Sequence, residues 1–419
     1  MSRTSRILLA AAILVHVTML AGWRSPFLAP LFFDVTVTSG TYGWDFNALY
    51  EAGANFLHGV DVYNTTPGER VEAAPYFTPF RYLPVSAYTV GAVLNLMPLD
   101  LAYKGWVAFV ELVLLACVYA TWKLVQDRDL FARLAAMWLA FTPFYVELMF
   151  GQFSFVQGAL VFAMMVLALR GTRPDWRFDA AWIVSVLWKL NTALFAPLVV
   201  RLQRWRGLAL LVVLVYVTTI PYFAAFPQGL PSFRSNFTTA VARHELGNHG
   251  LRQLAYETVL ALRPDFTGGG QTLQGLIMGG FVLVSLVLTF ADPEPDIPDQ
   301  LCLWMTTFFL VSPQVWEHHY TMLLPVLVML YWRTRSPWVA VCYVLLALPT
   351  PFFPAGLSAA VAANNALRSA PVEPAWIGLL YHAAKPLPTL ALYAFLAWRI
   401  ARRASPHFPR PALPSPATH

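Results

Sequence analysis

One aspartate, Asp45, has the sequence context of an acid–base catalyst. It begins an amphipathic segment in which Phe46 and Leu49 share one helical face. A carboxylate covered by aromatic rings, here those of Trp44 and Phe46, can have a shifted pKa and act as a general base. The structural alternative is a helix N-cap, in which the Asp45 carboxylate accepts a backbone N–H. The sequence leaves both interpretations open.

Two adjacent histidines form a second candidate, in the run Trp316-Glu317-His318-His319-Tyr320 between two apolar segments. Two histidines beside a glutamate are unusual at a membrane boundary, and His318 and His319 could belong to a functional site. The alternative is an interfacial belt, in which aromatic rings and imidazoles rest among lipid headgroups. Adjacent histidines cannot easily bind one zinc ion together, and no other ligand motif is visible. We therefore expect neither a metal site nor a cofactor.

Further polar residues interrupt apolar surroundings. Gln152 follows Gly151 in a turn between two apolar segments, and Lys189 lies in the middle of the apolar segment 180–200. A lysine at membrane depth marks a functional site by default, although it can also snorkel to the cytoplasmic surface. Arginines in external loops can bind lipid phosphates or simply be solvated. The predicted substrate-binding residues are Trp44, Arg81, Gln152, Lys189, Arg234, Arg252, Trp316 and Glu317.

The elements that position these residues are membrane helices. Hydrophobic residues make up 58% of the 419-residue chain and charged residues only 12%, about half the charge of a soluble domain. The segments 7–23, 208–226 and 273–291 carry no charge and approach or reach the roughly 20 apolar residues that span a bilayer. The net charge of +6 reflects loop arginines that set topology, so no nucleic-acid partner is expected. We predict an all-α, multi-pass protein of the cell membrane.

The basic residues predict the topology because Lys and Arg concentrate on the cytoplasmic side. Five basic clusters and the N-terminus are placed in the cytoplasm, which makes 34–100 and 227–271 large external loops. Arg3 and Arg6 precede the first apolar run without a good cleavage site after it, so we expect a retained first helix. About ten crossings follow. The clusters are Lys123/Arg128/Arg133, Arg170/Arg173/Arg177, Arg201/Arg204/Arg206, Arg333/Arg335 and Arg399/Arg402/Arg403.

Two segments do not fit a simple count of membrane crossings. The segment 180–200 has arginines at both ends, and a re-entrant pair of half-helices keeps both ends cytoplasmic. The segment 83–97 is apolar but short, and we predict a helix at the outer membrane surface. Residues 1–404 then form one multi-spanning domain, and the proline-rich tail 405–419 is expected to be disordered and cytoplasmic.

The order of these motifs resembles glycosyltransferase family 87, the polyprenol-phosphate-mannose-dependent mannosyltransferases of the GT-C architecture. The likeness rests on an early aspartate in a large external loop, a short surface helix, a Gly-Gln turn and a Trp-x-His-His-Tyr turn. The matching segments are 44–63, 80–106, 148–155, 180–197 and 312–325. The sequence departs from the family where Tyr82-Leu83-Pro84 replaces Tyr-Pro, and where Leu-Asn follows Lys189.

The resemblance implies a membrane glycosyltransferase with an active site on the extracytoplasmic face. Its donor would be a polyprenyl-phosphate sugar, with mannose expected, and its acceptor a hydroxyl of a lipid or glycan. The family pattern places a catalytic carboxylate at Asp45 and a functional histidine at His318 or His319. Membrane lipids are the other expected partners. Transfer of arabinose or another sugar is one alternative, and a transporter or channel with a polar site at Lys189 is another, although no internal repeat supports it.

Overall fold

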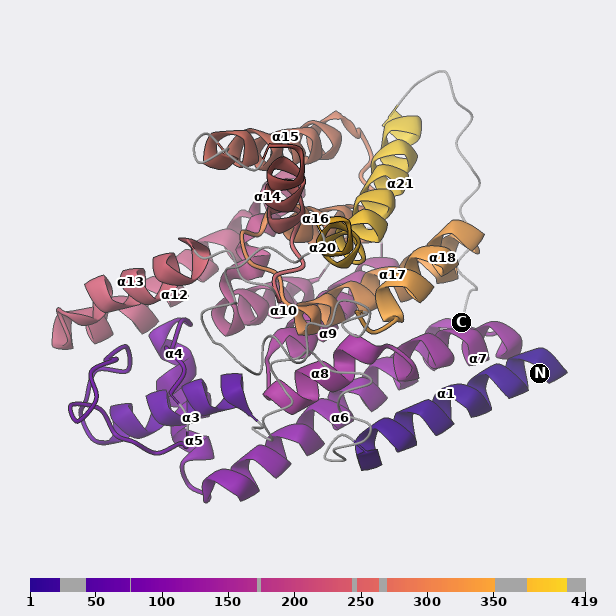
Figure 1. The fold of residues 1–419 in the computed structure, drawn as a ribbon. Helices are drawn as coiled ribbons and strands as arrows, with labels where there is room; N and C mark the ends of the chain where they lie inside the picture. The colour runs from indigo at the N-terminus through magenta and orange to yellow at the C-terminus, as the bar shows by residue number, and fades with distance from the viewer. Residues whose placement is uncertain are drawn as a thin grey trace.

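The computed structural model describes residues 1–22, 43–75, 77–171, 175–242, 247–263, 270–350 and 375–404, and every regular element in these ranges is helical (Figure 1). This confirms the all-α prediction. Four described helices are long and apolar enough to cross a membrane, while the count of about ten crossings stays a prediction. The tail 405–419 lies outside the described residues. The four are α1 (Arg3–Gly22), α6 (Leu99–Leu124), α12 (Trp205–Ala225) and the Gln274–Ala291 part of α15 (Gly270–Ala291).

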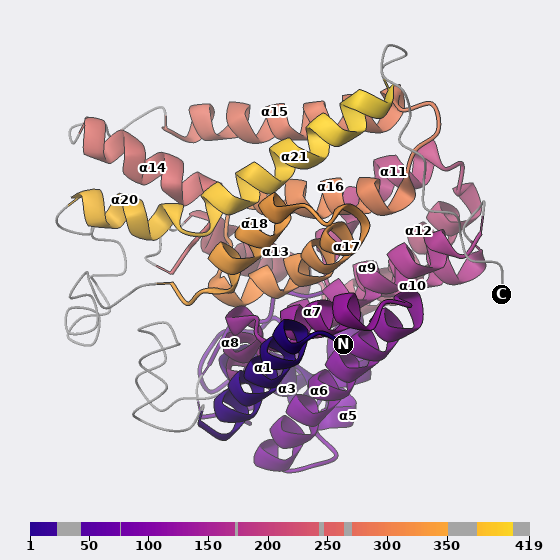
Figure 2. The same cartoon turned by 90° about the vertical axis from the view of Figure 1, so that its right-hand side faces the viewer.

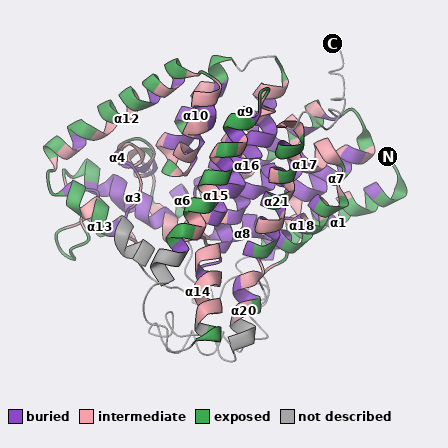
Figure 3. Cartoon of the chain, turned by 90° about the horizontal axis from the view of Figure 1, so that it is seen from above, coloured by how far each residue is buried: buried purple, intermediate pink, exposed green. Residues whose placement is uncertain are grey.

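These helices present apolar side chains outward, as expected of lipid-facing surfaces. On α12, Val212 and Tyr216 are 61% and 62% exposed, and on α6 Leu112 is 64% exposed. Figure 3 shows exposed residues along the length of α12. In water, such contiguous apolar faces would favour association or aggregation. Their presence on long helices with few charged residues supports a membrane protein.

Shorter helices fill the interior, where α9 and α16 pack side by side and α21 lies alongside α16 (Figure 2). Leu301, Trp304 and Leu327 are fully buried in this core. The interior helices are α7 (Arg128–Leu139), α8 (Thr142–Phe150), α9 (Ser154–Leu169), α10 (Trp176–Trp188), α16 (Ile297–Val311), α17 (Leu324–Thr334), α18 (Pro337–Ala347) and α21 (Pro386–Ala404).

Two predicted crossings are divided in the structure. The segment 130–148 breaks between α7 and α8, because Phe141 is extended and Pro143 starts a new helix. The segment 376–398 divides into α20 (Ala375–Ala383), which packs against α14 (Leu251–Leu262), and α21, which starts at Pro386. Proline fits the first turn of a helix because it has no N–H to donate there. Neither segment is therefore one continuous helix, and that each crosses the membrane stays a prediction.

The predicted external loops contain helices of their own. The first loop holds α3 (Trp44–Leu57), α4 (Pro84–Ser86), the π-helical turn η2 (Ala87–Gly91) and α5 (Ala92–Leu94), and the second holds α13 (Gly229–Ala242) and α14. A short helix at 83–97 was predicted, and the structure shows that it packs on α3. A Cβ atom on Gly53 would lie 2.2 Å from the carbonyl carbon of Gly91. This backbone contact between α3 and η2 requires glycine and fixes the position of α3.

The segment 180–200 folds back on itself. After α10 the chain continues as η3 (Leu190–Phe195) and α11 (Ala196–Arg201). The Trp182 indole donates to the Thr192 carbonyl at 2.9 Å, and Arg204 Nε donates to Asp179 Oδ1 at 2.9 Å, so the two ends of the hairpin meet. The membrane depth of this pair stays a prediction. Lys189 lies at its tip, about 20 Å along α10 from the arginine-bearing ends. This position does not support the alternative in which Lys189 snorkels toward those ends.

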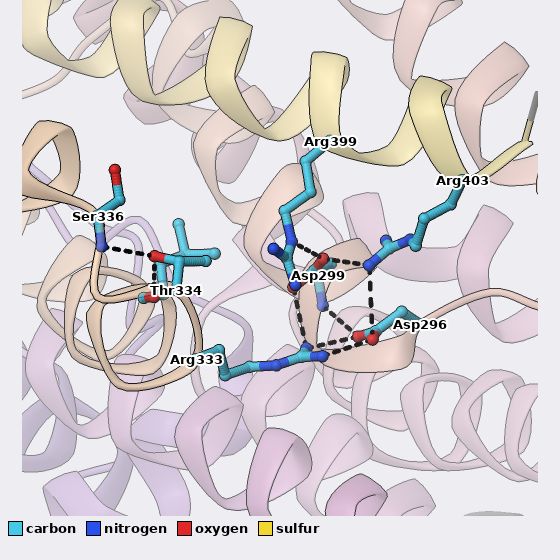
Figure 4. A network of polar contacts seen from close by, with 8 residues as sticks. Asp296, Asp299, Arg333, Thr334, Ser336, Arg399 and Arg403 are labelled. Atoms are coloured by element: carbon cyan, nitrogen blue, oxygen red, sulfur yellow. Dashed lines mark hydrogen bonds and ion pairs between the residues drawn. The ribbon is translucent and has the colours of Figure 1, made fainter. Parts of the chain in front are cut away.

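Arginines from two of the basic clusters predicted to be cytoplasmic meet two aspartates at the start of α16 (Figure 4). Arg333 contacts Asp296 at 2.5 Å and Asp299 at 2.9 Å, and Arg399 and Arg403 each reach Asp299 at 2.5 Å. Two separate helices, α17 and α21, thus converge on the start of α16. Nearby, the Arg201 guanidinium donates to the Asp292 carbonyl at 2.6 Å. The compartment that this end faces stays a prediction.

Candidate active site

Asp45 lies in the first turn of α3 and does not cap it. The N-cap is Gly43, with φ 74°, and no side chain caps this helix end. The alternative role of Asp45 as an N-cap was therefore wrong. The Asp45 side chain keeps 24% of its surface exposed. Its carboxylate is not used by the helix and remains accessible to a substrate.

A glycine contact joins the start of α3 to the turn that carries Gln152. The Gly43 N–H donates to the Met149 carbonyl at 2.8 Å. Gly151, with φ 63°, lies so close to Phe46 that a Cβ atom would be 2.5 Å from the Phe46 Cβ. Any larger residue at Gly151 would push the turn away from α3. The structure thus holds Gln152 beside Asp45, with their side chains hydrogen-bonded.

His318 approaches Asp45 from the other side. It belongs to η4 (Glu317–Leu323), a 3₁₀ turn, and its Nε2 lies 3.9 Å from Asp45 Oδ2. That separation is too long for a hydrogen bond, and the buried Nε2 has no hydrogen-bond partner among the described residues. The ring packs on Phe150 with centroids 5.1 Å apart. Burial, assisted by the Lys189 ammonium, lowers the pKa of His318, so the imidazole is neutral.

Lys189 completes the cluster. Its Nζ donates to Ser154 Oγ at 2.9 Å and lies 3.5 Å from Gln152 Oε1. The same ammonium lies 5.9 Å from the centroid of the Tyr82 ring, whose hydroxyl contacts Gln152 Oε1 at 3.4 Å. Lys189 lies in no ion pair with a described carboxylate within 4.0 Å. Its charge is thus available to an anionic ligand.

The electrostatics of Asp45 reflect burial and two nearby cations. Burial raises the pKa of Asp45, while Lys189, Arg81 and a hydrogen bond with the Gln152 side chain oppose the rise. Arg81 therefore lies close enough to act on this carboxylate. The Arg81 Nε is buried and has no hydrogen-bond partner among the described residues. A phosphate bound here would satisfy that donor and the Lys189 ammonium together.

An apolar pocket opens beside these charges. It is a small, half-open hollow between α3, the 82–90 segment and the tip of the α10 hairpin. Three of its lining residues directly adjoin the site residues in sequence. They are Tyr82 after Arg81, Phe153 after Gln152, and Trp188 before Lys189. Its other lining residues are Leu49, Ser86 and Val90. The arrangement places an apolar wall next to a polar, cationic site.

One buried acid was missed by the sequence analysis. Glu147 on α8 is 0% exposed, and its carboxylate accepts hydrogen bonds from the Phe155 N–H and the Thr321 hydroxyl. It therefore joins the start of α9, which carries Ser154, to η4, which carries His318. A glutamate inside the apolar segment 142–150 was a signal that could have found it.

The other predicted residues lie elsewhere. Glu317 faces Lys385 at 3.4 Å, and His319 Nδ1 accepts the Trp316 N–H at 3.1 Å. Arg252 Nε donates to Gln274 Oε1 at 2.8 Å, between α14 and α15. The structure places none of these in contact with Asp45, so the catalytic role of His319 and the substrate-binding roles of Glu317 and Arg252 stay predictions. Arg234 is exposed on α13, whereas Trp44 and Trp316 are half-buried.

Comparison with known proteins identifies the family. Residues 80–313, more than half of the chain, match glycosyltransferase family 87. The chain belongs to glycosyltransferase family 87. It is a membrane glycosyltransferase, which confirms the predicted family and does not support the transporter alternative. The match includes Gln152 and Lys189, whereas Asp45 and His318 lie outside it. A search of curated proteins found no match.

Proposed function

We propose that this family 87 enzyme transfers a sugar, with mannose the first candidate, from a polyprenyl-phosphate donor to an acceptor hydroxyl. The acceptor is a lipid or glycan, and the reaction occurs on the extracytoplasmic face with inversion. The observation that carries the proposal is the separation of Asp45 and His318. A partly exposed carboxylate faces a buried imidazole at 3.9 Å, and two cations lie beside them.

The geometry supports a single displacement. Asp45 takes the proton of the acceptor hydroxyl, whose oxygen forms a bond to the anomeric carbon. The bond from that carbon to the phosphate oxygen breaks, and the phosphate leaves with the electron pair. Lys189 and Arg81 stabilise the charge that develops on the phosphate. His318 Nε2, in the tautomer that carries its proton there, donates to an oxygen of the sugar or phosphate.

The apolar pocket supports a lipid-linked donor. A polyprenyl chain is apolar along its length, whereas its phosphate and sugar are polar. The pocket between Leu49, Val90 and Trp188 would hold the first isoprene units beside the phosphate. A donor that enters from the lipid phase needs such an apolar path to a cationic site.

A donor panel tests the reaction. Membranes that contain the protein are incubated with polyprenyl-phosphate mannose, glucose or arabinose, each labelled in the sugar, and with lipid extract as acceptor. We expect label from mannose to appear in a new glycolipid, and no transfer from sugar nucleotides. Transfer of arabinose alone would show that the sugar is arabinose and not mannose. Transfer only from sugar nucleotides would overturn the donor class.

The side of the membrane has its own test. Cysteines placed at Gly59 and Gly247 should react with an impermeant thiol reagent added to intact cells, and one at Gly171 should not. The three native cysteines are buried, so they give little background. Reversed labelling would place the reaction in the cytoplasm.

A further inference from the structure

A buried ion pair lies directly behind the turn that carries His318. Lys385, between α20 and α21, has its Nζ 3.4 Å from Glu317 Oε1, and the two residues are 0% and 2% exposed. The same ammonium donates to the Leu346 carbonyl at 2.7 Å and the Leu348 carbonyl at 2.5 Å. All three donors of the lysine are thereby directed at fixed acceptors.

The pair connects three distant parts of the chain. Lys385 satisfies carbonyl groups at the end of α18, and Glu317 accepts the Thr350 N–H at 3.2 Å. Removing two charges from water is expensive, and an apolar replacement of a buried pair is often no less stable. Stability alone therefore does not explain why Lys385 and Glu317 are charged. The fixed geometry that the ion pair imposes on η4 does explain it.

That geometry bears on the reaction through the adjacent residue. In a 3₁₀ turn, neighbouring side chains point about 120° apart. With Glu317 held against Lys385, His318 is directed away from that pair, and its Nε2 faces Asp45 at 3.9 Å. Rotation of η4 about its axis would move both side chains together. The contact that fixes one of them fixes the other.

We propose that Lys385, acting through Glu317, is a positioning residue that holds η4 in the rotation that points His318 at Asp45. Neither Lys385 nor Glu317 touches the reacting atoms in this arrangement. The inference rests on the proposed function for its kinetic test but not for its structural test. It assigns to Glu317 a positioning role in place of the predicted substrate contact.

The kinetic test compares Lys385→Met with Lys385→Arg in the full-length protein. Lys385→Met should lower kcat by about 10- to 100-fold, since small misplacements of catalytic groups have effects of this size. The KM for the donor should stay within about twofold, because Lys189 and Arg81 are untouched. Lys385→Arg keeps the charge and should recover most of kcat. Glu317→Gln keeps an acceptor for Thr350 and should resemble Lys385→Met in a protein that folds.

The structural test needs no activity. Modification of His318 by diethyl pyrocarbonate is followed by mass spectrometry, with the exposed His58 as an internal reference. His318 is 4% exposed and should react slowly in the wild type. In Lys385→Met and Glu317→Gln its rate relative to His58 should rise several-fold.

The matched control is Arg333→Met, which removes a cation from the other charged end. It should lower Tm and leave both kcat per folded protein and His318 modification unchanged. If Lys385→Met and Glu317→Gln behave like this control, the proposal is overturned. If the wild type transfers no sugar while His318 modification still depends on Lys385, the proposed function fails and the positioning role stands.

Discussion

Two clusters of charge lie at opposite ends of the same helices and differ in how fully they are paired. Asp299, at the start of α16, is 0% exposed and contacts Arg333, Arg399 and Arg403 at 2.5 to 2.9 Å. Asp45, at the other end, is 24% exposed and its one described ion-pair contact is His318 at 3.9 Å. About 20 Å of α16 separates Asp299 from the loop that leads to His318.

The difference indicates what each cluster does. Short contacts to arginine leave Asp299 little freedom, and they join α16, α17 and α21 at one end (Figure 4). At the other end, His318 Nε2 and Arg81 Nε are buried and have no partner among the described residues. Buried donors without partners are costly, so such groups suggest a ligand that completes them. The paired end holds the fold, and the unpaired end is prepared for a substrate.

The largest expected effect is that of Asp45→Asn. The variant should lose about 10²–10⁴-fold in transfer rate, because the amide cannot accept the proton of the acceptor hydroxyl. Gly43 supplies the N-cap, so expression and thermal stability should stay normal. Transfer of labelled sugar at saturating donor checks this. Asp45→Glu should recover little, since one methylene displaces the carboxylate. Near-normal transfer by Asp45→Asn would show that another residue is the general base.

A smaller loss is expected for His318→Gln, which should reduce kcat by about 10²-fold through loss of one positioned donor. His319→Gln is the matched control, because His319 Nδ1 accepts the local N–H of Trp316, and the imidazole that faces Asp45 is that of His318. Its effect on kcat should be below about tenfold. Steady-state kinetics on both variants show which histidine contributes more to kcat. An equal loss in the two variants would contradict the assignment of His318 alone to the reaction.

The pH dependence should separate the two groups. Burial raises the pKa of Asp45 above its ordinary value of 3.8, and the base acts only when deprotonated. As pH falls through that raised pKa, kcat/KM should decline. The lowered pKa of His318 means that it adds no further loss near pH 6.5. A profile of kcat/KM from pH 4 to 9 checks this. An acid limb near 6.5 that disappears in His318→Gln would make the histidine the base.

Much of the site could be predicted because its parts are local motifs. The helix after Asp45, the Gly151 turn and the His318 turn each follow from short-range patterns of glycine, aromatic and apolar residues. Placing the basic clusters in the cytoplasm and counting crossings between them put Asp45, Gln152 and His318 on one side of the membrane. The structure brings these three together.

Other features depend on contacts between distant segments and on helix rotation. Glu317 and His318 are adjacent, yet one faces Lys385 and the other faces Asp45. No spacing rule distinguishes them, because the rotation of a short 3₁₀ turn is set by its neighbours. For Lys189 the sequence left open a functional site or a side chain that reaches the cytoplasmic surface, and the return of η3 and α11 places it at the tip beside Gln152. Glu147 could have been found, since a glutamate inside an apolar segment is itself a signal, but its two partners, Phe155 and Thr321, could not.

The smallest effect on transfer is expected for Asp296→Asn, the same substitution as in Asp45→Asn but at the paired end. Asp296 contacts Arg333 at 2.5 Å and Arg403 at 3.5 Å, so its loss weakens charge-assisted hydrogen bonds between α16 and α17. The free energy of unfolding should fall by about 1–3 kcal/mol. Thermal unfolding in detergent should show a lower Tm, while kcat per folded protein stays within twofold of the wild type. Together the two substitutions test the comparison directly. Asp45→Asn should remove activity and leave stability unchanged, whereas Asp296→Asn should lower stability and leave activity unchanged. A tenfold loss of kcat in folded Asp296→Asn would show that the two ends are coupled through α16, and the division between a structural and a catalytic end would then be wrong.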